Sequence, residues 1–465
     1  MTAMATNTDE FERLRAVGLS EKYSTARHPL RFYLNVALSA NYTIPETFLL
    51  PLKDYIYRAV ETLINQHPIL SAIPLGEDTK EPYFARLPEI DLTQPISFQK
   101  PAQSLCLDEH DSELQSLLET QHNTGFTAPL PFWRLIVLAD DDSARRFTAV
   151  FVYHHGLGDG TSGKAFQRTF LQALRGAASL KSGEAKQVVT PPKTALLPNL
   201  EAVHPLPISM LYLLKAIFRK WFDSKPDPKL WAGGPIQLPL KTQVRLVVLT
   251  AAQTSALVQV CRKHDTTVTC AVETAIARSL FPHIPDKFTV IEGSLPITQR
   301  PWLPDTITDD SMGVYVQTLE QTFSRKTVTQ EAFPWSEAQR TRRSVTKELA
   351  LKSKDTSVGL FKYVQDYRRD LCETKVGKAR TSTFELSSLG VVKTENVEDP
   401  SVPQMGRVIF TQCASVTGSA LEFSMITGAD GCLGLGISWQ TNVLKDDMVQ
   451  DVIDTLKKEL HQLSG

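Results

Sequence analysis

The fold of this chain is decided by the stretch Phe147-Thr-Ala-Val-Phe-Val-Tyr-His-His-Gly-Leu-Gly-Asp-Gly-Thr-Ser-Gly-Lys164. Its first seven residues carry no charge and are rich in β-branched and aromatic side chains, which predicts a buried strand. After the stretch, apolar residues recur at helical spacing as far as Leu174. We therefore predict a strand, a glycine turn and a helix, with His154, His155 and Asp159 at the carboxyl end of the strand. Ligand sites of α/β proteins gather at that edge.

Three interpretations of the glycine turn need no catalytic histidine. Residues 158–163 fit the dinucleotide-binding pattern G-x-G-x-x-G, but the acid at the required distance, Glu184, stands in a polar segment and does not close a second strand. Residues 158–164 fit a phosphate-binding P-loop, but Ala165 has no hydroxyl for Mg²⁺. A purely structural turn is the third interpretation. Against it, alternate strand residues point to opposite faces, so one of two adjacent histidines can face a cleft while the other is buried.

The fourth interpretation is the pattern His-His-x-x-x-Asp-Gly, from His154 to Gly160. An alcohol or amine that attacks a thioester must lose a proton, and a neutral imidazole is the natural base for it. Because the acceptor itself attacks, the enzyme needs no Ser or Cys nucleophile. The chain indeed contains no G-x-S-x-G elbow of the α/β-hydrolase type. The pattern therefore favours acyl transfer.

This pattern resembles the active-site motif of the chloramphenicol acetyltransferase-like superfamily, which includes nonribosomal condensation domains. By that resemblance His155 and Asp159 are the catalytic residues of the motif. His155 is the general base, whereas Asp159 is an architectural partner paired with an arginine. Arg300, between two prolines, matches the position of that arginine. His154 and Gly160 would then have structural roles at the active site.

Further segments resemble the fungal alcohol O-acetyltransferase family within that superfamily. They are Arg13–Tyr23, Tyr33–Val36, Asn65–Leu70, Thr267–Arg278 and Thr381–Gly390. The last of these ends in Ser-Ser-Leu-Gly, and family members carry Ser or Asn at the second polar position, here Ser388. Ser388 is therefore a candidate substrate-binding residue that lines the acyl channel or meets the developing oxyanion. A turn serine that satisfies backbone groups fits the same pattern.

The alternation of helices and strands indicates only an α/β protein. The resemblance implies a mixed α+β sandwich of two similar chloramphenicol acetyltransferase-like domains with a tunnel between them. We expect an N-terminal acyltransferase domain at 1–190, a linker with an apolar helix at 191–242, and a C-terminal domain at 243–465. Local patterns further predict a short helix around Leu14 and a strand at Met312–Val316.

The linker helix, Ile208–Phe222, is strongly apolar and carries the basic residues Lys215, Arg219 and Lys220. We expect it to line the junction between the domains. The alternative is that it lies on a membrane surface.

Composition excludes several classes of partner and site. Basic and acidic residues are almost balanced, 50 against 51, so nothing favours nucleic acid as a partner. Six cysteines without CxxC spacing indicate reduced thiols, with no disulfide frame and no metal site. The polar N-terminus has no apolar segment of the signal-peptide type, and no apolar run reaches the length of a membrane span. We expect a cytoplasmic monomer.

The predicted activity is that of an acyl-CoA-dependent O-acyltransferase. Its co-substrate would be a coenzyme A thioester, most simply acetyl-CoA, and its acceptor the hydroxyl of a small or natural-product alcohol, with no bound cofactor. The plant branch of the superfamily is disfavoured because its Asp-Phe-Gly-Trp-Gly motif does not occur. Three alternatives stay open: transfer to an amine, transfer from a carrier-protein thioester, and a non-catalytic binding or scaffold protein of the same fold.

Overall fold

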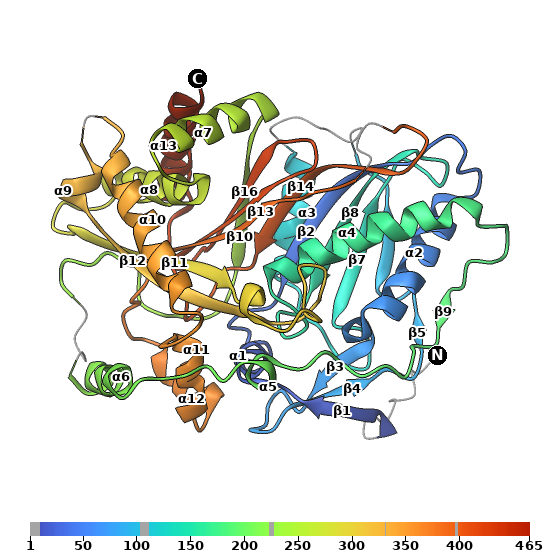
Figure 1. The fold of residues 1–465 in the computed structure, drawn as a ribbon, viewed down its shortest axis with the longest axis horizontal. Helices are drawn as coiled ribbons and strands as arrows, with labels where there is room; N and C mark the ends of the chain where they lie inside the picture. The colour runs from blue at the N-terminus through green and yellow to red at the C-terminus, as the bar shows by residue number, and fades with distance from the viewer. Residues whose placement is uncertain (1–9, 103–110, 223–226, 331, 396–398) are drawn as a thin grey trace.

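The computed structural model describes residues 10–102, 111–222, 227–330, 332–395 and 399–465, except for the side chains of 219–222 (Figure 1). One large sheet has five strands in the order β14 (Gln404–Gln412), β2 (Val36–Thr43), β8 (Arg146–Tyr153), β7 (Trp133–Leu138) and β6 (Ile96–Gln99). The strand predicted from the opening stretch is β8, which lies at the centre between β2 and β7. Helices α2 (Leu52–Gln66) and α4 (Gly160–Gly176) pack together on this sheet (Figure 1).

The second large sheet has six strands. Their order is β10 (Thr242–Leu249), β16 (Leu433–Gln440), β15 (Leu421–Thr427), β13 (Phe384–Val391), β11 (Val290–Thr298) and β12 (Val316–Ser324). Helices α7 (Ala251–Lys263), α8 (Val268–Leu280), α10 (Trp335–Ala350) and α13 (Asp446–Ser464) gather beside this sheet (Figure 1). A separate apolar core forms beneath them, as expected of a layer of helices on a sheet.

Strand β14 joins the two halves of the chain. Its neighbours in sequence, β13 and β15, belong to the six-stranded sheet, but β14 pairs antiparallel with β2 and completes the five-stranded one. The sheets approach closely there, since a side chain at Gly436 of β16 would place its Cβ 2.4 Å from the carbonyl oxygen of Phe410. The division of the chain at residues 242 and 243 stays a prediction, but this strand exchange ties the two halves together.

Two local predictions are wrong, and in both the backbone bonds to a partner that the local pattern does not reveal. Residues 12–16 form a strand, β1 (Glu12–Ala16), and not a helix, because they pair with β4 (Tyr83–Arg86). This pairing belongs to a small sheet with β3 (Ala72–Leu75), next to α1 (Leu19–Arg27). Strand β12 begins only at Val316, since the backbone of Gly313 and Tyr315 bonds instead to the residues of the glycine turn.

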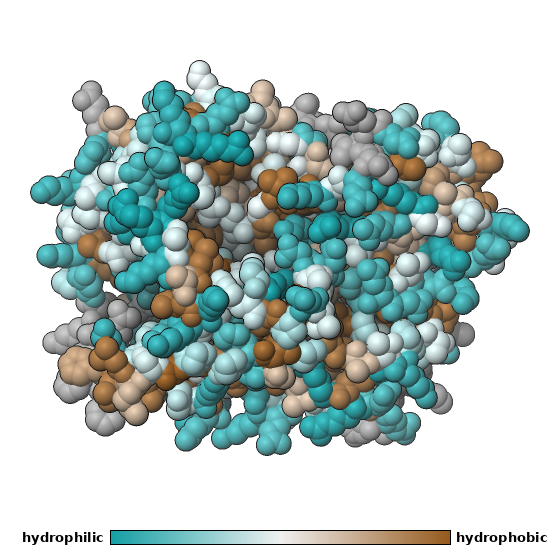
Figure 2. All heavy atoms as spheres, viewed as in Figure 1, coloured by the Kyte–Doolittle hydropathy of each residue, from teal (hydrophilic) through white to brown (hydrophobic). Residues whose placement is uncertain are grey.

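Helix α6 (Met210–Phe222) does not line the junction between the sheets. Five of its apolar side chains are exposed, among them Met210 at 70%, Leu211 at 65% and Leu214 at 56%. They belong to the apolar patch at the lower left of the molecule, beside α11 (Ser357–Leu360) and α12 (Tyr367–Leu371) (Figures 1 and 2). Among the described residues, no helix is both long and apolar enough to cross a membrane.

Candidate active site

The motif occupies the turn between β8 and α4. Strand β8 ends at Tyr153 and α4 begins at Gly160, earlier than the apolar spacing suggested. The helix starts there because Asp159 caps it: its Oδ1 accepts the backbone N–H of Ser162 at 3.1 Å. The six residues from His154 to Asp159 therefore lie together at the carboxyl end of the central strand.

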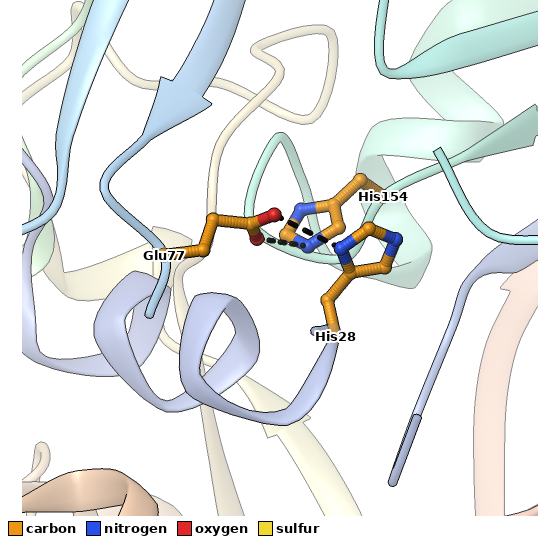
Figure 3. A group of neighbouring side chains, drawn as sticks. All are labelled: His28, Glu77 and His154. Carbon is orange, nitrogen blue, oxygen red and sulfur yellow. Dashed lines mark hydrogen bonds and ion pairs between the residues drawn. The ribbon is translucent and has the colours of Figure 1, made fainter. Parts of the chain in front are cut away.

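His154 is buried in a network with Glu77 and His28 (Figure 3). Its Nε2 lies 3.1 Å from Glu77 Oε1, and its Nδ1 accepts the backbone N–H of Gly156 at 2.9 Å. The other oxygen of Glu77 accepts from His28 Nδ1 at 3.0 Å, while His28 Nε2 accepts the N–H of Phe126 at 3.1 Å. The carboxylate therefore bridges two imidazoles that come from distant parts of the chain.

The backbone fixes the tautomer of both rings. Each imidazole accepts an N–H at its far nitrogen, so its own proton lies on the nitrogen that faces Glu77. Burial acts to raise the pKa of Glu77, but His154 and His28 outweigh it and lower that pKa to about 2. These residues have the types and spacing of a metal site. However, a metal ion would need the facing nitrogens free of protons, so the network fits a structural role better.

The turn that follows His155 requires a glycine at position 156. A Cβ at this position would lie 2.9 Å from both Cε1 and Nδ1 of His154. The His154 ring thus packs directly against the backbone that follows His155, and it holds the chain on both sides of that residue.

His155 points to the other side of the strand end, where it lines a cavity of about 240 Å³. Its ring is edge-on to that of Tyr33, with 5.5 Å between centroids, and the Arg27 guanidinium lies 4.4 Å from the same Tyr33 ring. Burial first, and then the positive charge of Arg27, lowers the pKa of His155 to about 4. Its Nδ1 is enclosed and has no hydrogen-bond partner among the described residues. The imidazole is therefore neutral at neutral pH.

Asp159 turns away from His155 and binds Arg300. Two guanidinium nitrogens donate to its two carboxylate oxygens at 2.8 and 3.0 Å, across 141 positions of sequence. The backbone N–H of Tyr315 donates to the same carboxylate at 3.0 Å. Both charged side chains are buried, at 5% exposure for Asp159 and 2% for Arg300. Burial acts to raise the pKa of Asp159, but Arg300 outweighs it and the net shift is downward, so the carboxyl is ionised. The pair connects the motif turn to the end of β11.

The structure brings Gly160 to the cavity but not Ser388. Gly160 lines it, and a Cβ there would lie 2.7 Å from Leu389 Cδ2. Ser388 Oγ lies 3.0 Å from Thr269 Oγ1 of α8, and Ser388 is not among the residues that line the cavity. Ser387 and Glu385 line it instead, as expected for alternation along β13. The roles predicted for all these residues stay predictions.

Several residues that line the cavity were not predicted from the sequence. Tyr33 donates its hydroxyl to Gln412 Oε1 at 2.9 Å, and Gln412 Nε2 donates to Glu385 Oε1 at 3.1 Å. Glu422 and Arg27 also line the cavity. Tyr33 and Glu385 lie in segments that resemble the family, but nothing in those segments marks them as cavity residues. The set comes from α1, β13, β14, β15 and the segment before β2, and the strand exchange of β14 brings it together.

Comparisons with known proteins agree with this geometry. The model of the alcohol acetyltransferase family matches residues 108–460. The probable alcohol acetyltransferase crmB of Aspergillus fumigatus is 35% identical over 456 residues, which cover 94% of this chain and 96% of that protein. The probable alcohol acetyltransferase FCK4 of Fusarium pseudograminearum is 26% identical over 475 residues, 96% of this chain and 94% of its own.

Solved structures confirm the predicted fold class. The TRI3 trichothecene 15-O-acetyltransferase of Fusarium sporotrichioides superposes with a TM-score of 0.70 over 97% of this chain and 95% of its own, at 15% identity. The epimerization domain of tyrocidine synthetase B, TycB3(E), gives a TM-score of 0.62 over 98% and 97%, at 14% identity. The chain is thus a mixed α/β acyltransferase with the chloramphenicol acetyltransferase-like fold, and it belongs to the alcohol acetyltransferase family.

Proposed function

We propose that this protein transfers an acetyl group from acetyl-CoA to the hydroxyl of a small alcohol, with His155 as the general base. The observation that carries the proposal is a neutral imidazole in a cavity at the end of the central strand, its pKa lowered to about 4. Such a ring is free to accept a proton at neutral pH. Membership of the alcohol acetyltransferase family supports the choice of reaction.

In this mechanism the acceptor alcohol gives its proton to His155 as its oxygen attacks the thioester carbonyl. The tetrahedral intermediate then collapses and its C–S bond breaks. The imidazolium of His155 gives the proton from the alcohol to the leaving coenzyme A thiolate. The products are the acetate ester and coenzyme A with a free thiol. Because Nδ1 of His155 is enclosed, Nε2 is the nitrogen that exchanges the proton. The nearby charge of Arg27 disfavours the imidazolium and so promotes its return to the leaving group.

The remaining motif residues would position the base. Arg300, which follows β11 of the other sheet, braces the turn after His155 by binding Asp159, and Asp159 itself would not be in the proton path. Glu77 and His28 hold His154, and His154 holds Gly156. That the protein works as a cytoplasmic monomer without bound cofactor or metal stays a prediction from the sequence.

The test is release of free thiol from acetyl-CoA by the purified protein, measured over a panel of alcohols and matched amines, with the ester identified by mass spectrometry. We expect acceptor-dependent release with alcohols, and its loss in His155→Ala. A second arm offers the acetyl group on a carrier-protein pantetheine. Transfer to amines alone, transfer from the carrier alone, or no acceptor-dependent release would each contradict the proposal.

A further inference from the structure

More than half of the residues that line the cavity beside His155 carry a hydrogen-bonding side chain. Six serine and threonine residues are among those that line it: Ser20, Ser24, Thr318, Ser357, Ser387 and Ser415. A cavity of this size, about 240 Å³, suits a small ligand. A simple hydrocarbon chain would offer no hydrogen bond to the polar groups of this wall.

Two carboxyl groups form the most unusual part of this wall. Glu385 of β13 and Glu422 of β15 are register partners on adjacent parallel strands, so their side chains lie next to each other. Within the described part of the chain, neither carboxyl has a Lys, Arg or His within ion-pair distance. Burial, and then the neighbouring Glu385, raises the pKa of Glu422 well above its usual value. A buried acid pair without a bonded cation costs stability, which points to a functional role.

Gln412 connects this acid pair to the base. Its Nε2 donates to Glu385 at 3.1 Å and lies 3.5 Å from Glu422 Oε2. Its orientation is fixed because Tyr33 donates to its Oε1 at 2.9 Å. The ring of Tyr33 also contacts His155. The acid pair and His155 are therefore separated by about one tyrosine side chain, within the span of one small molecule.

The charges around the cavity favour a neutral ligand. Arg27 lines the cavity with its Nε buried and without a described partner. Arg380, whose Nη1 donates to the carbonyls of both Ser415 and Gly418, lies within electrostatic reach of Glu422. Two guanidinium groups thus already lie near this wall without pairing with its carboxyls, and an ammonium ligand would add a third positive charge. A hydroxyl group can both donate to a carboxyl and accept from Arg27, and it needs no charge.

We propose that the acceptor is a small neutral polyol, with one hydroxyl at His155 and a second bound by Glu385, Gln412 and Glu422. This inference rests on the proposed function and names its acceptor class. In this proposal the acid pair determines specificity, because it binds a second hydroxyl of the acceptor. A monohydric alkanol has no second hydroxyl. A site built to hydrogen-bond a hydroxyl discriminates strongly against an analogue that lacks it.

The experiment measures kcat/KM with acetyl-CoA for monohydric alkanols, terminal diols, amino alkanols of equal chain length, and open-chain polyols. We expect diols or polyols to exceed the matched alkanol by roughly 10-fold or more, as for one or two buried hydrogen bonds. Glu422→Leu should remove most of this preference, so that kcat/KM for diols and polyols falls toward the value for the matched alkanol. Glu422→Gln, which keeps a donor and an acceptor, should retain it.

The outcomes separate this inference from the proposed function. If no alcohol is acetylated, the proposed function itself fails. If alkanols and polyols are acetylated equally well, the function stands and the polyol inference is overturned. A preference for amino alkanols would overturn it in favour of a cationic acceptor. Thermal unfolding of Glu422→Leu and Glu422→Gln controls for folding, and an unchanged preference in a folded Glu422→Leu would also overturn it.

Discussion

His154 and His155 are neighbours in the chain, yet they have opposite surroundings at the end of β8. His154 has a partner at both ring nitrogens: its Nε2 lies 3.1 Å from Glu77 Oε1, and its Nδ1 accepts the backbone N–H of Gly156. His155 faces the cavity, and its enclosed Nδ1 has no described partner. The fold thus gives two adjacent histidines different environments: it places a partner at each ring nitrogen of His154 and leaves the neutral ring of His155 open to the cavity.

The largest expected effect is on activity through His155. His155→Ala should lower kcat by roughly 10²- to 10⁴-fold, about 3–5 kcal/mol of transition-state stabilisation, as for a lost general base. Its melting temperature should stay close to that of the parent protein, because the ring makes few polar contacts. His154→Ala should instead lower the melting temperature. If the two variants exchange these behaviours, the roles assigned to the two histidines are inverted.

The Asp159–Arg300 pair should combine both kinds of effect. Asp159→Asn and Arg300→Ala each leave a buried charge without its partner, which costs about 3–5 kcal/mol of unfolding free energy, and each also loosens the turn after His155. Denaturant unfolding and kcat should therefore decline together. The double variant should lose less than the sum of the two. Fully additive losses would show that the side chains act independently.

Glu77→Gln tests the hydrogen-bonding network that holds His154 in place. The NH₂ group of the glutamine would face the N–H of one imidazole, so that two donors would meet. That imidazole could move its proton to the other nitrogen only by losing the hydrogen bond that it accepts from the backbone of Gly156 or Phe126. We expect about 1–3 kcal/mol of destabilisation, the cost of a buried polar group left unpaired. The fall in kcat should exceed the change in KM, since the His155 turn moves and the cavity does not.

Asp78→Asn is the matched control for Glu77. It removes a carboxylate from the next residue of the same loop, and that side chain is exposed. Activity and stability should stay close to the parent values. Equal losses in the two variants would indicate a general effect of charge in this loop and not a role of the histidine network.

The pH dependence should follow the lowered pKa of His155. The neutral base persists until the pH approaches about 4, so kcat should fall only there in protein that stays folded. Between the ordinary value of 6.5 and about 4, the unfolded chain binds a proton at His155 that the folded chain does not. This residue therefore makes the fold less stable as the pH is lowered through that window. His155→Ala should therefore show a smaller change of unfolding free energy with pH in that window. A kcat that already falls near pH 6.5 would contradict the environment assigned to His155.

Ser388→Ala should have the smallest effect. The hydroxyl contacts Thr269 at 3.0 Å outside the cavity, so its loss should cost about 1 kcal/mol of stability and leave kcat unchanged. Ser387→Ala, on the cavity side of β13, provides the comparison. A clear loss of kcat in Ser388→Ala, with Ser387→Ala unaffected, would restore the role predicted from the sequence.

What the sequence predicted correctly is local or carried by a motif. The strand and turn of residues 147–160 follow from composition and spacing, and the resemblance identified Arg300 as the residue that the structure places against Asp159. His28 and Glu77 carried no such signal. They reach His154 from 126 and 77 positions away, and neither lies in a motif or a periodic segment.

The cavity wall was unpredictable for the same reason. Gln412 faces Glu385 only because β14 leaves its own half of the chain and pairs with β2. Local patterns do not encode such an exchange. They also misled at residues 12–16 and 312–315, where pairing with β4 and with the motif turn overrides helical or strand-like spacing.

The most direct measurement of the central claim is chemical rescue of His155→Ala by imidazole in solution. Wild-type protein, His155→Ala and His154→Ala would be assayed with saturating acetyl-CoA and acceptor over a range of imidazole concentrations. If His155 is the base, added imidazole should restore part of the lost turnover in His155→Ala, in proportion to its neutral fraction, and should not raise that of His154→Ala. Near wild-type kcat for His155→Ala without imidazole, or rescue of His154→Ala instead, would contradict the account.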